Sequence, residues 1–257
     1  MTSFSAVGLV LRLYPVGESD IILDFFTREM GRLSALAKGG KRSMKRFTGI
    51  LLLGHLLELE LGLGGKGGDL WRLDAAHLIT SNAGLGQDFR RFLAAGPIWE
   101  LLLRATAPLD PHPPALNLAM LTLARLAAAE QERELASYLL VFLVRLLKEL
   151  GYGLSLETCL GCGLAADQIK EPVLSLEGGL LCPACAGGKM GRMEFAAPLG
   201  LVKGLAAAAA LEPKALGRLS FAPAALRPGL AFLSRFWQET VTNDLPSLAL
   251  AQKTLLK

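Results

Sequence analysis

The four cysteines of the chain form two C-x-x-C pairs, Cys159 with Cys162 and Cys182 with Cys185. Two intervening residues let both thiolates of a pair reach one ion from a single tight turn. Four thiolates are the ligand set that tetrahedral zinc prefers, and a site with four protein ligands is closed to substrate. The spacing therefore predicts one structural Zn²⁺ ion, held by the loop that spans residues 159–185.

Two other uses of these cysteines are weaker. Four unrelated core cysteines would rarely fall into two such pairs, although buried cysteine is common. A redox dithiol of the thioredoxin type is normally a single pair after a strand. His55, His77 and His112 all lie far upstream and add no further ligand near the pairs. A cytosolic setting also disfavours disulfides between the pairs.

Basic residues gather in one stretch of a chain whose net charge is only +4. Residues 27–48 carry one acid, Glu29, and seven basic side chains: Arg28, Arg32, Lys38, Lys41, Arg42, Lys45 and Arg46. A lone basic run of this kind is commonly a solvated loop. Within a barrel, however, several cations on a curved, glycine-containing loop can neutralise the phosphates of nucleic acid. These seven residues are therefore candidate phosphate contacts.

The first 80 residues have the pattern of a small β-barrel. Short runs rich in β-branched and aromatic residues, with glycines at the turns, predict strands at 5–14, 20–27, 32–37, 48–62 and 70–79. Residues 38–46 are expected to form a basic loop, and the glycine-rich residues 62–68 a hairpin tip. Five strands with one basic connection favour an OB-fold barrel.

The rest of the chain, residues 81–257, reads as helical. Apolar spacing and prolines predict helices at 85–95, 97–107, 115–129, 132–150, 195–211 and 228–242. The segment 132–150 is apolar nearly all round, so it is expected to be the buried central helix. Residues 245–257 are expected to be a loosely docked tail. The fold class is therefore α+β, an OB barrel followed by a helical domain with an embedded zinc loop.

Aromatic residues that could stack on bases are few in the barrel segment. Phe25, Phe26, Phe47 and Trp71 are the candidates, beside Phe4 and Tyr14. Alternate strand residues must face the core, so most of these rings are expected to be buried. Binding through phosphates is therefore the expected mechanism.

No enzymatic signature stands out in the sequence. It has no Walker lysine motif, no Ser/His/Asp constellation and no His-x-Glu pair of the zinc deaminases. The longest early apolar run, residues 6–11, is too short for a signal peptide, and charged residues interrupt the other apolar stretches. We expect a cytoplasmic protein without a membrane span and without turnover of its own.

Several segments match a known family. They are Gly-Leu-Val-Leu at 8–11, Gly-Glu-Ser-Asp at 17–20, Phe-Thr-Arg-Glu-Met-Gly at 26–31, Ala-Lys-Gly-Gly-Lys-Arg at 37–42, and Phe-Leu-Val-Arg-Leu-Leu-Lys-Glu-Leu-Gly-Tyr at 142–152. Because of these segments, the chain resembles the RecO family of bacterial recombination mediators along almost its whole length. Residues 38–42 depart a little from the family's Lys-Gly-Ala-Arg-Arg style, but their basic character is kept.

The resemblance implies an OB fold that binds single- and double-stranded DNA and anneals complementary strands at the nucleoid. It also favours the seven basic residues as the predicted DNA contacts: Arg28, Arg32, Lys38, Lys41, Arg42, Lys45 and Arg46. It also implies partnership with RecR, contact with the C-terminal tail of single-stranded-DNA-binding protein, and help in loading RecA at gaps. Some members of the family lack the cysteines, which implies that zinc stabilises the helical domain and is not required for activity.

A different class of function is a zinc-ribbon regulator that binds duplex DNA through the same basic loop. Such a protein would need a recognition helix that carries Arg, Asn or Gln toward the bases, and no predicted helix has a cluster of these. Strand annealing separates the two hypotheses, because a mediator accelerates it and a repressor does not.

Overall fold

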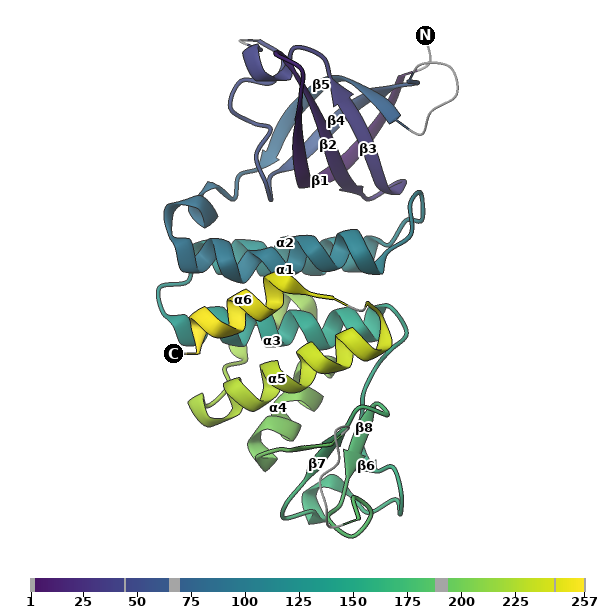
Figure 1. Cartoon of the computed structure of the whole chain (residues 1–257), viewed down its shortest axis with the longest axis vertical. Helices are drawn as coiled ribbons and strands as arrows, with labels where there is room; N and C mark the ends of the chain where they lie inside the picture. Colours follow the sequence, from purple (N-terminus) through teal and green to yellow (C-terminus); the bar gives the residue numbers. More distant parts are fainter. Residues whose placement is uncertain (1–2, 44, 65–69, 188–193, 243, 257) are drawn as a thin grey trace.

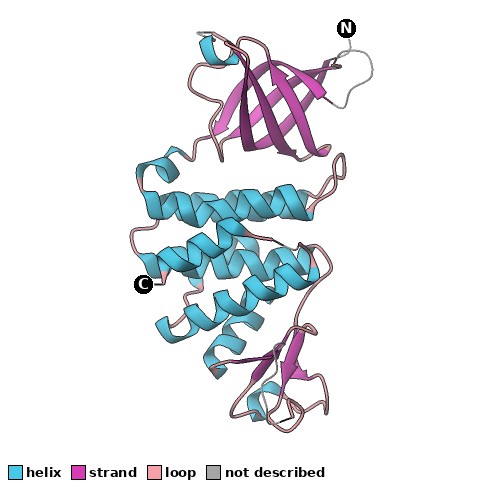
Figure 2. Ribbon diagram, in the orientation of Figure 1, coloured by secondary structure: helices cyan, strands magenta, loops and turns pink. Residues whose placement is uncertain are grey.

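The computed structural model describes the chain except for residues 1–2, 44, 65–69, 188–193, 243 and 257. Figure 1 shows three parts in succession along the longest axis: a β-barrel, layers of helices, and a small sheet at the far end. Figure 2 shows that strands lie at both ends and helices between them. The α+β class and the N-terminal barrel are confirmed.

The barrel is closed in the strand order β1-β2-β3-β5-β4, which is the order of an OB fold. Strand β1 pairs antiparallel with β2 and β4, and β3 pairs parallel with β5. The strands are β1 (Ser3–Val16), β2 (Asp20–Thr27), β3 (Gly31–Ala37), β4 (Leu56–Gly62) and β5 (Leu70–Thr80). Most of the predicted hairpin tip at 62–68 lies outside the described residues.

The predicted strand at 48–62 is wrong in its first half, because only Leu56–Gly62 is a strand. The residues before it turn instead, and Phe47 and Leu51 enter the barrel interior. Burial of these two apolar side chains stabilises the turn. The basic loop is therefore tied to the barrel core at its C-terminal end.

Alternation along the strands separates an inner from an outer face. In β3 the residues alternate between buried and half-buried, and Leu33, Ala35 and Ala37 face the interior. Leu9, Leu11, Phe26 and Leu56 belong instead to the core of the helical part. The outer face of the barrel nearest the helices is thus covered by them.

Among the described residues, six α-helices make up the middle of the molecule: α1 (Phe89–Ala105), α2 (Pro113–Ala128), α3 (Glu132–Glu149), α4 (Leu199–Ala210), α5 (Pro223–Thr240) and α6 (Pro246–Leu255). Helix α3 begins with a capping box formed by Gln131 and Glu134, and Gly151, at φ 87°, follows its C-terminus. It contacts α1, α2, α4, α5 and α6. The predicted buried central helix is confirmed.

One helix stands where two were predicted at 85–95 and 97–107. Helix α1 runs through Pro97, and it begins after Asp88, whose side chain caps the backbone N–H of Arg90. Pro97 removes one helical hydrogen bond, but it is buried with Leu93 and Ile98. The packing of this face offsets the loss, so the helix continues.

Two further helices start at other residues than predicted. Helix α5 starts at Pro223 and passes through Pro228, which was predicted to open it. The predicted helix at 195–211 begins only at Leu199, because Phe195 belongs to a short strand, β9 (Glu194–Ala196). A proline fits the first turn of a helix, but it does not show which of two nearby prolines occupies that turn.

The predicted loose tail is also wrong. Residues 246–255 form α6, which packs along α1 and buries Leu245, Leu248, Ala251 and Leu255. The backbone N–H of Ser247 donates to Glu100 Oε2 at 3.0 Å. The spacing of these apolar residues by three and four is that of a helix with one buried face.

The segment around the cysteines is a four-stranded sheet in the order β6-β8-β7-β9. The other three strands are β6 (Ser155–Cys159), β7 (Val173–Ser175) and β8 (Gly179–Leu181). Its main helix contacts are β6 with α4 and β9 with α5, rather than with the central helix α3. Within the described ranges, no helix is long and apolar enough to cross a membrane.

Candidate nucleic-acid interface and metal centre

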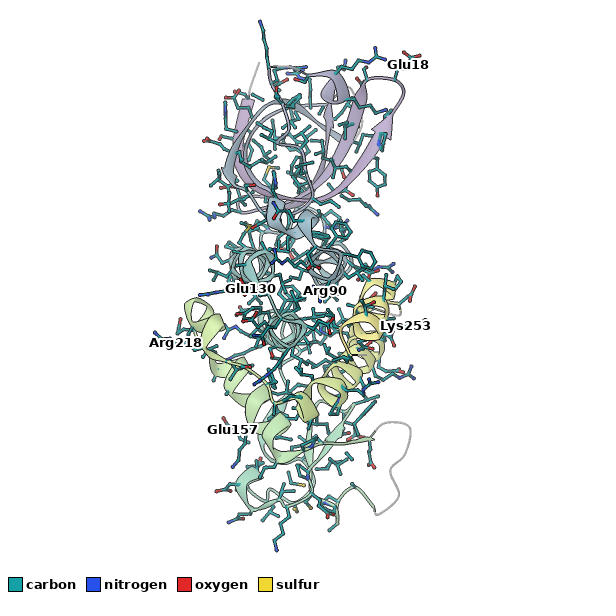
Figure 3. The ribbon with its side chains drawn as sticks, turned by 90° about the vertical axis from the view of Figure 1, so that its left-hand side faces the viewer. Glu18, Arg90, Glu130, Glu157, Arg218 and Lys253 are labelled. Carbon is teal, nitrogen blue, oxygen red and sulfur yellow. The ribbon has the colours of Figure 1, made fainter. Side chains whose placement is uncertain are left out.

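The basic loop lies at the end of the barrel farthest from the helices, beside the β1–β2 turn. Figure 3 labels Glu18 of that turn at the extremity of the molecule. Asp20 Oδ1 accepts a hydrogen bond from Gly39 N at 2.8 Å, and this bond lowers the pKa of the Asp20 carboxyl. Lys41 N donates to Ser19 O at 2.9 Å. The first part of the loop is thus bonded to the adjacent turn.

Two of the predicted cations hold the loop in place. Lys41 Nζ donates to Gly17 O at 2.7 Å. Arg46 donates to Lys38 O at 2.6 Å and to Asp74 O at 3.4 Å, and its guanidinium lies 4.9 Å from the centroid of the Phe47 ring. Arg46 therefore ties the end of β3 to β5, and its replacement would change the shape of the loop as well as its charge.

The other three cations of the loop are available to a ligand. Among the described residues, Lys38 and Lys45 form no ion pair, and both are exposed. Arg42 lies 3.8 Å from Glu18, with both side chains largely in solvent. Such an exposed pair contributes little and is readily exchanged for a phosphate.

Arg28 and Arg32 are not part of this cluster. They lie at the opposite end of β2 and β3, about 23 Å away along an eight-residue strand. Arg32 donates to Thr106 O at 3.2 Å, and Arg28 lines a 700 Å³ pocket with Asn117 and Leu121 of α2. The structure brings five of the seven predicted residues together and places the other two at the junction with the helices.

The aromatic candidates differ in their exposure to solvent. Phe25 and Phe47 are buried in the barrel interior, and Phe26 is buried on the outer face that the helices cover. Trp71 is half-buried, with its ring centroid 6.4 Å from that of Phe4. Tyr14 points outward from β1, and Arg12 lies over its ring. The sequence analysis missed Arg12 and Arg72, because both lie outside the basic stretch. The alternation of residues along β1 and β5 could have predicted that these two side chains face outward.

The four cysteine sulfurs converge, all within 4.8 Å of one another. Cys162 Sγ lies 3.7 Å from Cys182 Sγ, close to the roughly 3.8 Å expected for tetrahedral zinc with Zn–S bonds of about 2.3 Å. Cys159 and Cys182 are buried, and Cys162 and Cys185 are exposed. These residues fit a metal ion in number, type and spacing.

Each pair lies on a tight turn. Gly163 N donates to Cys159 O at 2.9 Å, with Gly163 at φ 75°, and Cys185 N donates to Cys182 O at 3.0 Å. A Cβ at Gly161 would lie 2.8 Å from Cys185 Sγ. Only glycine therefore lets the first turn approach the second this closely.

The surroundings of two thiols shift their pKa values in opposite directions. Burial raises the pKa of Cys159, but hydrogen bonds from the backbone of Cys162, Cys182 and Gly161 outweigh it and lower that pKa to about 6. Side-chain hydrogen bonds with Cys182, Cys162 and Cys159 raise the pKa of Cys185 to about 12. All four sulfurs can ionise together only around a cation, which is the condition that zinc supplies.

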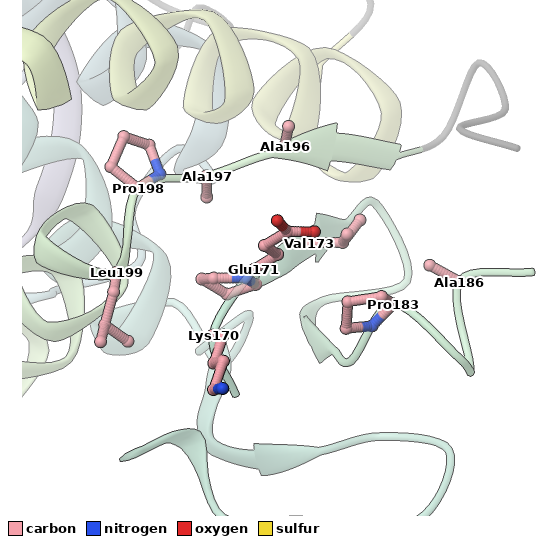
Figure 4. Close-up of a pocket in the computed structure, with 10 residues that line it drawn as sticks. Lys170, Glu171, Val173, Pro183, Ala186, Ala196, Ala197, Pro198 and Leu199 are labelled. Carbon is pink, nitrogen blue, oxygen red and sulfur yellow. The ribbon is translucent and has the colours of Figure 1, made fainter. Parts of the chain in front are cut away.

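A pocket of 590 Å³ lies between the cysteine sheet and the start of α4 (Figure 4). Its walls are mainly apolar, and Lys170 and Glu171 are the ionisable side chains among its lining residues. These two side chains do not make a nucleophile–base pair.

The structure defines a class of proteins in which an OB barrel is joined to a helical domain that carries a four-cysteine centre. Family models described as "Recombination protein O N terminal" and "Recombination protein O C terminal" match residues 1–82 and 86–249. The chain therefore belongs to the RecO family, which acts in DNA repair and recombination mediation.

Curated relatives agree with this assignment, and each is named "DNA repair protein RecO". The relative from Geobacter metallireducens is 30% identical over 97% of both chains. The one from Anaeromyxobacter dehalogenans is 32% identical over 84% of this chain and 85% of its own. The one from Frankia casuarinae is 34% identical over 69% and 71%.

Proposed function

We propose that this chain is a recombination mediator that binds single- and double-stranded DNA through the outer end of its barrel. With RecR it assists the loading of RecA onto DNA covered by single-stranded-DNA-binding protein, whose C-terminal tail it contacts. It accelerates the annealing of complementary strands in the cytoplasm, at the nucleoid, and has no turnover of its own.

The observation that carries this proposal is the gathering of Lys38, Arg42 and Lys45 on an anchored loop at the exposed end of the barrel. Cations held near one another lose little conformational entropy when a phosphate backbone arrives. Phosphate contacts carry no sequence information, so the binding is independent of sequence. The membership of the chain in the RecO family supports DNA as the ligand.

One structural zinc ion per chain completes the proposal, with Cys159, Cys162, Cys182 and Cys185 as its ligands. It stabilises the sheet that caps α4 and α5. Lys41 and Arg46 are assigned to shaping the loop, and Arg28 and Arg32 to the junction between barrel and helices.

The test is a triple variant, Lys38→Ala, Arg42→Ala and Lys45→Ala, titrated by fluorescence anisotropy with a 20-nucleotide single strand and a 20-base-pair duplex. Each lost phosphate contact should reduce the log–log salt slope by about 0.7 for the single strand and about 0.9 for the duplex. Affinity should fall for both ligands, and sequence preference should not change.

The matched control removes the same charge elsewhere, by Lys170→Ala, Lys203→Ala and Lys253→Ala. These three lysines are exposed on the helical part and the cysteine sheet. If the control variant lowers affinity and salt slope as much as the loop variant does, only net charge matters and the loop is not the contact.

Strand annealing separates a mediator from a zinc-ribbon regulator. The protein should accelerate annealing of complementary oligonucleotides stoichiometrically and without ATP, because it has no phosphate-cradling motif. Tight duplex binding with no effect on annealing would instead favour the regulator.

A further inference from the structure

The outer face of the barrel carries an apolar row that the phosphate contacts do not explain. Tyr14 of β1 pairs with Ile22 of β2, Ile22 with Leu36 of β3, and Leu36 with Arg72 of β5. The neighbours in sequence of these residues, such as Leu23, Ala35 and Leu73, face the interior. Alternation therefore places the whole row on the outside.

Three members of this row, Tyr14, Ile22 and Leu36, are aromatic or apolar and yet reach solvent. Tyr14 is 37% exposed, and Ile22 and Leu36 are half-buried. Strands β1, β2 and β3 lie side by side in the barrel (Figure 1). Side chains opposite each other on paired strands lie about 5 Å apart, so Tyr14, Ile22 and Leu36 form a continuous floor across the three strands. Lys38, at the end of β3, places the basic loop next to this floor.

A buried acid fixes a cation on the ring at one end of the floor. Asp24 is 6% exposed and accepts hydrogen bonds from Arg12 Nε at 2.8 Å and Ser34 Oγ at 2.5 Å. The Arg12 guanidinium lies 4.5 Å from the centroid of the Tyr14 ring, while the Arg12 side chain stays 51% exposed.

Burying a carboxylate costs free energy, and an arginine on the surface is stable in water without a carboxylate partner. Here the acid holds the guanidinium against the ring before any ligand arrives. A flat ring and a flat guanidinium, both exposed and already held together, are the groups on which nucleic-acid bases stack.

We propose that Tyr14, Arg12, Ile22 and Leu36 form a base-binding floor for the unpaired bases of single-stranded DNA. This rests on the proposed function, and adds that the barrel distinguishes single strands from duplex. Duplex bases are already stacked on one another and cannot lie on the floor. Stacking contacts the face of a base and leaves its pairing edge free, so a bound strand can still meet its complement.

The experiment compares three 20-nucleotide probes: oligo(dT), an abasic strand of the same length, and a duplex. The variant Tyr14→Ala should lower the affinity for oligo(dT) by roughly 5- to 150-fold, which corresponds to the loss of one base–aromatic stack. Affinity for the abasic strand and the duplex, and the salt slope for every probe, should not change. Tyr14→Phe should bind as the wild type does.

Tyr152→Ala is the matched control, because Tyr152 is comparably exposed but lies beyond the C-terminus of α3. A measurement on the unaltered protein guards against misfolding of the variant: photocrosslinking to 5-iododeoxyuridine in the oligo(dT) strand should modify the peptide that contains Tyr14.

Equal wild-type affinity for oligo(dT) and the abasic strand, or crosslinks only outside β1–β3, would overturn the floor. The proposed loop contacts would survive that result if the triple loop variant still lost affinity and salt slope. A wild-type protein that binds none of the three probes would overturn both proposals.

Discussion

At the scale of single residues, Cys182 offers a direct test of the metal centre. It is buried, and its N–H donates to Cys159 Sγ at 3.2 Å, so it joins the two turns. Cys182→Ser would leave three thiolates around the ion. We expect zinc content well below one per chain and a Tm lower by roughly 4–8 °C.

Leu164→Ser is a suitable control, because Leu164 is exposed beside the first turn and supplies no ligand. Zinc is measured by elemental analysis and Tm by calorimetry. Protein purified without zinc, with four freely reactive thiols under native conditions, would disprove the metal centre.

The spacing of the cysteines predicted their convergence because two C-x-x-C pairs constrain each turn locally. The seven basic residues were harder to place. A window of 22 residues covers both a hairpin and the loop after it, so it joins positions at opposite ends of β2 and β3. Composition cannot show this separation; only strand length and register do.

At the scale of elements, the start of α1 provides a prediction about pH. A side-chain hydrogen bond from Arg90, together with the Arg90 backbone N–H, lowers the pKa of Asp88 from 3.8 to about 2. Because the folded pKa is depressed, the stabilisation is fully present above about pH 4 and is lost as pH falls toward 2. Asp88→Asn keeps a capping side chain but removes the charge.

The Tm of the wild type should therefore exceed that of Asp88→Asn by a constant amount near pH 6, and the difference should shrink between pH 4 and pH 2. Asp244→Asn serves as control, since Asp244 is exposed and forms no ion pair among the described residues. A difference that persists unchanged at pH 2 would show that the charge of Asp88 is not the cause.

Periodicity predicted the strands and helices far better than their ends. The alternation in β3 and the apolar α3 are strong local signals. Pro97 and Pro228 are also local signals, but buried neighbours such as Leu93 and Leu230 decide that the helices continue through them. Closure of the barrel through the parallel pair β3 and β5 depends on contacts distant in sequence, so no single segment indicated it.

At the scale of the whole molecule, the junction between barrel and helices depends on Gly31. This residue has φ 66°, and a Cβ there would lie 2.0 Å from Asp110 O in the loop between α1 and α2. Leu109 N donates to Arg32 O at 3.0 Å in the same place. Gly31→Ala should therefore push the loop away and loosen the junction.

Gly17→Ala is the matched control, because Gly17 also has positive φ, 51°, but nothing lies within 4 Å of its Cβ position. We expect Gly31→Ala to lower Tm by about 4–8 °C more than the control, with faster hydrogen exchange at residues 106–110. Equal Tm values for the two variants would show that the loop at Asp110 can move away without a loss of stability.

The basic loop and the cysteine sheet lie at opposite ends of the long axis, with the helices between them (Figure 1). The main contacts of the sheet are with α4 and α5, and those of the barrel are with α1 and α2. The two ends can therefore evolve independently. If the cysteines were lost in evolution, new residues would have to cover only α4 and α5, and the basic loop with the residues that anchor it could stay unchanged.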